Sequence, residues 1–132
     1  EGRKLGLNAR AALISRGFAE MTRFGLARGA QAATLAGLAG LGDLVLTCSS
    51  TSSRNFSLGK GIGEGRRPAE LLADRRTVAE GAFTAPVLKR AADEAGVDMP
   101  IVAAVCELLA GEAGVGEVVE RLLARPLRSE GV

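Results

Sequence analysis

Apolar residues recur along the first part of the chain at alternating steps of four and three positions. This spacing is typical of one face of an amphipathic helix, which we expect over residues 6–29, with Gly29 as its stop. The apolar stripe consists of Leu7, Ala11, Ile14, Phe18, Met21 and Gly25. The opposite side carries Arg16, Glu20 and Arg23, which are spaced for ion pairs along the helix. Such a helix needs a partner surface for its stability.

The middle of the chain is divided by glycines and prolines into short segments. Small apolar residues predict two short helices, over 31–38 and 41–47, and the polar stretch 49–55 predicts a loop or a helix start. Near Gly65 the glycines occupy every second position, so we expect any helix over 55–65 to fray or stop. Pro68 then opens a short helix that is expected to reach Asp74.

Three further helices are predicted in the last part of the chain. Residues 77–96 form one, in which Thr77 and Glu80 have the spacing of a capping box and Gly96 is the stop. Its expected ion pairs are Lys89–Asp93 and Arg90–Glu94. Pro100 starts the next helix, with an inner face of Ile101, Val105 and Leu108. The stripe of the last helix, which Pro126 terminates, consists of Val115, Val118, Val119, Leu122 and Leu123.

The pattern contains no convincing strand and no internal repeat. Alanine and leucine supply most of the apolar content, and aromatic residues make up only 3% of the chain. The sequence therefore predicts an all-α fold, a single domain over residues 1–132 with about six to eight helices. Because the chain begins with Glu1 rather than Met, we expect a fragment of a longer protein.

Composition excludes several kinds of chemistry. The chain has no histidine, which rules out imidazole acid–base catalysis and imidazole metal ligands, and we expect no metal site. Its cysteines, Cys48 and Cys106, are not in a CxxC arrangement and are expected to be reduced residues of a cytoplasmic protein. A net charge of +2 is too small to indicate nucleic-acid binding. No apolar run is long enough for a membrane span.

Asp43 is the first candidate for function, because it lies among small and apolar residues. A carboxylate in such a segment must be hydrogen-bonded or paired if it is buried. The alternative is an acidic residue in the first turn of a helix, where the helix dipole favours it. The residues alone leave both interpretations open.

The second candidate is the cluster Ser52–Ser53–Arg54–Asn55. Arginine offers a planar fork of donors for a phosphate, and neighbouring hydroxyl, amide and helix N-terminal groups can complete an anion site. The alternative is a serine N-cap beside a surface arginine. The glycine run at 59–65 satisfies neither GxGxxG nor GxxxxGK[ST], and no strand precedes it, so we interpret it as a flexible turn.

These residues resemble a known family. The string GLGDLVLTCSSTSSRN (40–55) is similar to the signature of the helical C-terminal domain of bacterial-type NAD(P)-dependent glycerol-3-phosphate dehydrogenases. Three further segments match in order: GLNARAALISRG (6–17), TVAEG (77–81) and VDMPI (97–101). The resemblance covers nearly the whole chain.

The resemblance implies a function and a set of site residues. Members exchange hydride between NAD(P)(H) and the pair dihydroxyacetone phosphate and sn-glycerol 3-phosphate, which supplies phospholipid synthesis. By this resemblance Asp43 lies at the substrate, near a catalytic lysine. The Ser-Arg-Asn residues that would contact the substrate are Ser53, Arg54 and Asn55, and the cofactor would meet Arg54, Val78 and Glu80.

The chain also departs from the family pattern. The family's N-terminal Rossmann domain is absent, and so is the catalytic lysine, which belongs upstream, so no catalytic residue is expected in this chain. We therefore expect a substrate-binding domain that is inactive alone and whose partners are a Rossmann domain and a second copy in a homodimer. The alternative interpretation is a non-catalytic helical dimerisation or assembly module.

Overall fold

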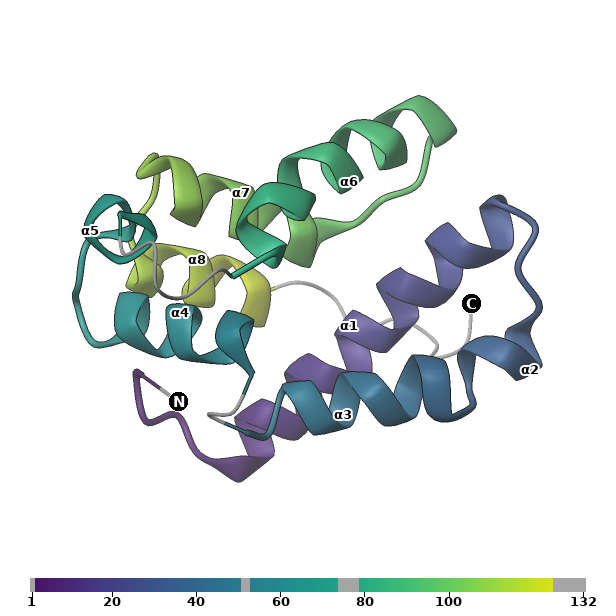
Figure 1. Cartoon of the computed structure of the whole chain (residues 1–132), viewed down its shortest axis with the longest axis horizontal. Coiled ribbons are helices and arrows are strands. Elements are labelled where there is room, and N and C mark those ends of the chain that lie inside the picture. Colours follow the sequence, from purple (N-terminus) through teal and green to yellow (C-terminus); the bar gives the residue numbers. More distant parts are fainter. Residues whose placement is uncertain (1, 51–52, 74–78, 125–132) are drawn as a thin grey trace.

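The computed structural model describes residues 2–50, 53–73 and 79–124, in which helices are joined by turns and loops and no strand occurs (Figure 1). The elements are α1 (Leu7–Ala27), α2 (Ala32–Leu35), the π-helical turn η1 (Leu38–Gly42), α3 (Asp43–Thr47), α4 (Arg54–Gly63), α5 (Pro68–Leu72), α6 (Gly81–Ala95), α7 (Pro100–Ala110) and α8 (Val115–Leu123). The predicted all-α fold is confirmed. Asp74, Thr77, Val78 and Pro126, on which several expectations rest, lie outside the described residues.

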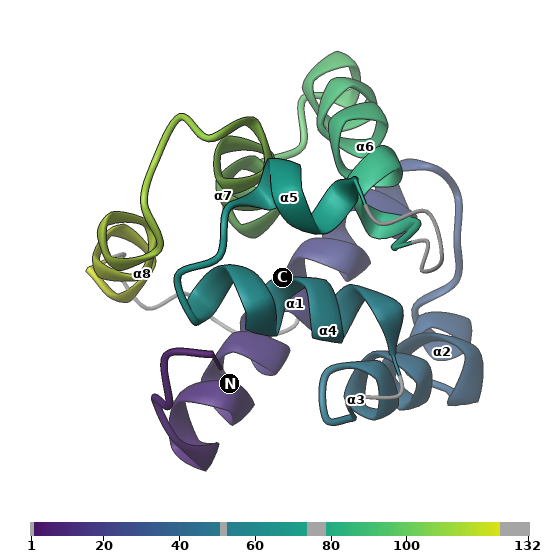
Figure 2. The same cartoon turned by 60° about the vertical axis from the view of Figure 1, so that its left-hand side comes forward.

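The helices form two groups on either side of α1 (Figure 1). One group contains α2, η1 and α3, which pack along α1, and the other contains α4 to α8. Figure 2 shows α8 and the α2–α3 pair at opposite ends of the molecule. The chain passes from the first group to the second between the end of α3 at Thr47 and the start of α4 at Arg54.

The core is built from small side chains. The buried apolar residues among those described are Ala79, Ala85, Ala92, Met99, Ala104 and Val118. Large apolar side chains remain exposed on several helices, including Leu7 at 73%, Leu38 at 91% and Phe83 at 68%. The described residues thus leave much apolar surface for contact with other protein.

Helix α4 corrects the expectation that the glycine run 55–65 frays or stops. It continues through Gly59, Gly61 and Gly63. Ser53 caps its start by accepting a hydrogen bond from the Phe56 N–H at 3.2 Å. Gly61 lets α5 approach closely, since a Cβ at this position would lie only 3.0 Å from Leu71 Cδ1.

The segment 31–47 also differs from its prediction. The helix expected over 31–38 ends at Leu35, and the helix expected over 41–47 starts at Asp43. Between them, η1 closes a wider turn, in which the Gly42 N–H donates to the Gly37 carbonyl at 3.1 Å. Ala36 and the extended Gly37 separate α2 from η1, as the glycine pattern predicts, whereas η1 continues directly into α3.

The expected cap and ion pairs of the helix over 77–96 are confirmed in part. α6 begins at Gly81 with Glu80 as its N-cap, so the expected start at residue 77 is wrong, and Thr77, the other residue of the expected capping box, lies outside the described residues. Lys89 pairs with Asp93 at 2.6 Å, whereas Arg90 and Glu94, both described, make no ion pair. Gly96 ends the helix in the left-handed conformation with φ of 68°, as predicted.

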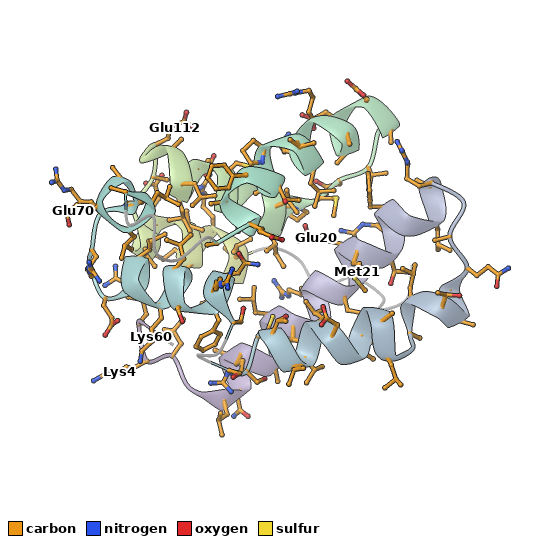
Figure 3. The ribbon with its side chains drawn as sticks, in the orientation of Figure 1. Lys4, Glu20, Met21, Lys60, Glu70 and Glu112 are labelled. Carbon is orange, nitrogen blue, oxygen red and sulfur yellow. The ribbon has the colours of Figure 1, made fainter. Side chains whose placement is uncertain are left out.

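The expectation that the polar side of α1 carries surface ion pairs is wrong. Arg16 Nη1 donates to the Leu122 carbonyl at 2.7 Å, and Arg23 Nη2 donates to the Asp98 carbonyl at 2.9 Å. Glu20 is 3% exposed and faces the α6 and α7 side of α1 (Figure 3). These side chains hold α1 against the second group of helices, because they form hydrogen bonds with backbone groups of that group.

Glu20 supplies the cap that α7 lacks locally. Its carboxylate accepts hydrogen bonds from the Ile101 N–H at 2.7 Å and from the Val102 N–H at 3.3 Å, in the first turn of α7. Pro100 has no N–H, so these two donors are the ones that most need an acceptor. A carboxylate from another helix therefore does what a local Ser or Asp usually does.

The buried Glu20 should make folding depend on pH. Burial raises its pKa above 4.5, although the two backbone N–H donors and Arg23 lower it. Because the folded pKa is the higher one, the folded state binds the proton more tightly than the unfolded state. The contribution of Glu20 is therefore complete below about pH 4.5 and is lost as the pH rises through the folded pKa.

Urea unfolding of wild type and Glu20→Gln across this range measures the effect, since glutamine does not titrate. We expect the difference in free energy of unfolding, wild type minus variant, to fall as the pH rises and then to level off. A difference that increases with pH would contradict the assignment.

Candidate functional site

Most of the described candidate residues lie at the N-termini of α4 and α6. Ser53 is the N-cap of α4, and Arg54 and Asn55 are the first residues of that helix. Glu80 is the N-cap of α6, and Gly81 is its first residue. Both ends carry the positive end of a helix dipole.

Arg54 is exposed, and its guanidinium makes no hydrogen bond or ion pair with the described residues. Ser53 caps the helix, so the N-cap interpretation of the serine is confirmed. The cap also leaves Arg54 at the first position of α4, where its planar fork is available to an external anion.

Asn55 connects the two helix ends. Its Oδ1 accepts a hydrogen bond from the Gly81 N–H at 2.8 Å, across 26 positions of sequence. This bond satisfies the first backbone donor of α6 from a different helix. The structure therefore brings Ser53, Arg54 and Asn55 together with Glu80.

Sequence reasoning did not single out Gly81, although it stands in the TVAEG segment. A Cβ at this position would lie 2.9 Å from Asn55 Oδ1 and 3.0 Å from Asn55 Cγ. The signal that could have found Gly81 is a glycine directly after an acidic residue, within the TVAEG segment that carries the resemblance. Val78, the other residue expected at the cofactor, lies outside the described residues.

Asp43 is exposed, which corrects the expectation of a buried acid that must be paired. It is the first residue of α3, so the alternative of an acidic residue in a first helical turn is confirmed. Its apolar neighbours Val45 and Leu46 are also 44% and 66% exposed. No hydrogen bond or ion pair between described side chains joins Asp43 to Arg54.

Cys48 lies close to Asp43. Burial raises the pKa of the Cys48 thiol, while the Thr47 hydroxyl and Arg10 lower it and Asp43 raises it further. Burial raises the pKa of Cys106 as well. Both cysteines are unpaired and held in the unreactive thiol form, which does not favour a nucleophilic role.

The described residues contain no group of three or more acidic or cysteine side chains that could hold a metal ion. Within the same residues, no helix has the length and apolarity required to cross a membrane.

The family model for the C-terminus of NAD-dependent glycerol-3-phosphate dehydrogenase matches residues 1–120. The chain belongs to this family. Similar curated relatives are glycerol-3-phosphate dehydrogenase [NAD(P)+] 1 of Sphingopyxis alaskensis, 68% identical over 131 residues, and glycerol-3-phosphate dehydrogenase [NAD(P)+] of Erythrobacter litoralis, 71% identical over 130 residues. The alignments cover 99% and 98% of this chain, but only 40% and 39% of the relatives.

A solved structure of the glycerol-3-phosphate dehydrogenase of Coxiella burnetii superposes with a TM-score of 0.90 at 40% identity. The superposition covers 94% of this chain and 38% of that structure. The chain is therefore similar to the C-terminal part of these dehydrogenases and spans about two fifths of their length.

Proposed function

We propose that this chain is the substrate-binding domain of an oxidoreductase that interconverts dihydroxyacetone phosphate and sn-glycerol 3-phosphate with NAD(P)(H). The product would supply phospholipid synthesis. The observation that carries the proposal is the exposed Arg54 guanidinium at the first position of α4, which has no partner among the described residues and lies beside the start of α6 that Asn55 holds.

Arg54 fits the phosphate of the substrate. A dianionic phosphate can accept two parallel hydrogen bonds from a guanidinium, and backbone N–H groups at the start of α4 favour the same charge. The Ser53 hydroxyl and the Asn55 amide lie next to it on the chain and complete the set of donors. An exposed position suits these groups, because the ligand must replace their water.

Asp43 would act at the other end of the substrate. An exposed carboxylate at the start of α3 can accept a hydrogen bond from a substrate hydroxyl or hold a lysine ammonium in place. The catalytic lysine that the family implies is not assigned to any residue of this chain. Asp43 is thus proposed as a binding and orienting group.

Arg54, Val78 and Glu80 are proposed as the cofactor contacts. The described part of this set fits a dinucleotide, because it offers a free cation for a phosphate and an exposed carboxylate for hydroxyl or amide donors. When bound, the nicotinamide supplies the hydride. The residues of this chain orient the two ligands toward each other.

A chimera tests the proposal. This chain would replace the matching segment of the Sphingopyxis alaskensis enzyme, to which it is 68% identical. We expect the chimera to oxidise NADH or NADPH with dihydroxyacetone phosphate, while the isolated chain shows no turnover in the same assay. A folded chimera without activity, or clear turnover by the isolated chain, would contradict the proposal.

We further propose that the domain works in the cytoplasm and in a homodimer. The two unpaired cysteines support a reducing compartment. Self-association is supported by the exposed apolar side chains of α1 and α6, among them Leu7 and Phe83.

A further inference from the structure

The two polar atoms of the Asn55 side-chain amide differ in their hydrogen bonding. Its Oδ1 is occupied by the Gly81 N–H at 2.8 Å, whereas its Nδ2 makes no hydrogen bond with any described residue. An amide can accept through one atom and donate through the other at the same time. Asn55 is therefore able to hold α6 and a ligand beside Arg54 at once.

Gly81 is suited to this contact for a steric reason. A Cβ on residue 81 would lie 2.9 Å from Asn55 Oδ1, 3.0 Å from Cγ and 3.3 Å from Nδ2. All three distances are shorter than ordinary van der Waals contact, so an alanine here must displace the amide. The residue next to Glu80 thus has to be a glycine if Asn55 is to keep its position.

We propose that Asn55 and Gly81 form a positioning clamp between the substrate and cofactor sites. This inference rests on the proposed function. The clamp holds the start of α6, and with it Glu80, at a defined place relative to Arg54. A substrate phosphate that accepts a hydrogen bond from Asn55 Nδ2 orients the same amide whose Oδ1 holds Gly81, so each ligand favours the geometry that the other needs.

A double-mutant cycle in the active chimera tests the clamp. Asn55→Ala and Gly81→Ala should each raise the KM of the cofactor about fivefold, since each removes one hydrogen bond of ordinary strength. Truncating Asn55 makes room for the new Cβ, so Gly81→Ala should change the cofactor KM by less than about twofold in the Asn55→Ala background. Equal effects in both backgrounds, or no effect of either single change, would overturn the clamp.

Asn55→Asp separates positioning from substrate contact. The carboxylate keeps the acceptor for Gly81, so the cofactor KM should stay within about twofold of the parent value, whereas the KM for dihydroxyacetone phosphate should rise because the carboxylate repels the phosphate. An increase in cofactor KM as large as that of Asn55→Ala would overturn the proposal. If Gly81→Ala lowers the melting temperature of the chimera, the comparison of Asn55→Asp with Asn55→Ala still tests the clamp.

Arg54→Ala distinguishes failure of the proposed function from failure of the clamp alone. If that change leaves catalysis intact, the proposed function fails. If it impairs catalysis while the cycle between Asn55 and Gly81 is additive, only the clamp fails.

Discussion

Arg54→Ala should lower kcat/KM of the chimera by about 100-fold or more, which corresponds to about 3 kcal/mol of lost binding in the transition state. The reason is that Arg54 has no partner among the described residues, so its guanidinium is free to pair with a phosphate. Removing it leaves that charge without its bidentate partner. Steady-state kinetics with each substrate varied in turn measure the loss.

Two further variants make the Arg54 prediction specific. Arg54→Lys keeps the charge but removes the planar fork, so we expect an intermediate loss. Arg90 is also exposed and makes no ion pair with any residue that the structure describes, and it lies toward the far end of α6 from Glu80, so Arg90→Ala is the matched control. Equal kinetics for Arg54→Ala and Arg90→Ala would refute the assignment of Arg54.

The helices were predictable from the sequence because their information is local. A stripe at steps of three and four, a proline at a helix start and a glycine at a helix end act within one or two turns. Accordingly, α1, α7 and α8 lie where their patterns place them, and Gly96 ends α6. The irregular path through η1 was not predictable, since it depends on how α2 and η1 pack.

The contacts that assemble the site were not predictable, because they join distant positions. Glu20 caps α7 across 81 positions, and Asn55 caps α6 across 26. No local sequence motif predicts a hydrogen-bond acceptor that belongs to another helix. Residue chemistry and the resemblance of short segments to a family indicate the candidate residues, and the structure adds which backbone groups Ser53 and Asn55 hold.

Gly40→Ala should lower the free energy of unfolding of the chain by about 3 kcal/mol or more. Gly40 is buried inside η1, and a Cβ at this position would collide with the Leu35 carbonyl oxygen. It would also lie 2.7 Å from the Leu35 carbonyl carbon and 2.9 Å from its Cα. These are backbone atoms of α2, so no side-chain rotation can relieve the clash, and η1 must move together with Asp43, three residues further on.

Gly42→Ala is the matched control in the same π-helical turn. A Cβ on residue 42 would lie 3.6 Å from the Gly37 carbonyl oxygen and 3.7 Å from Leu38 Cδ2, which are ordinary contacts. Alanine is also favoured over glycine in a helix by up to about 1 kcal/mol, so this variant should be neutral or more stable. Urea unfolding followed by circular dichroism compares the two variants. Similar changes for both would show that helix propensity decides the stability of η1, and a large loss confined to Gly40→Ala would show that the close approach of η1 to Leu35 decides it.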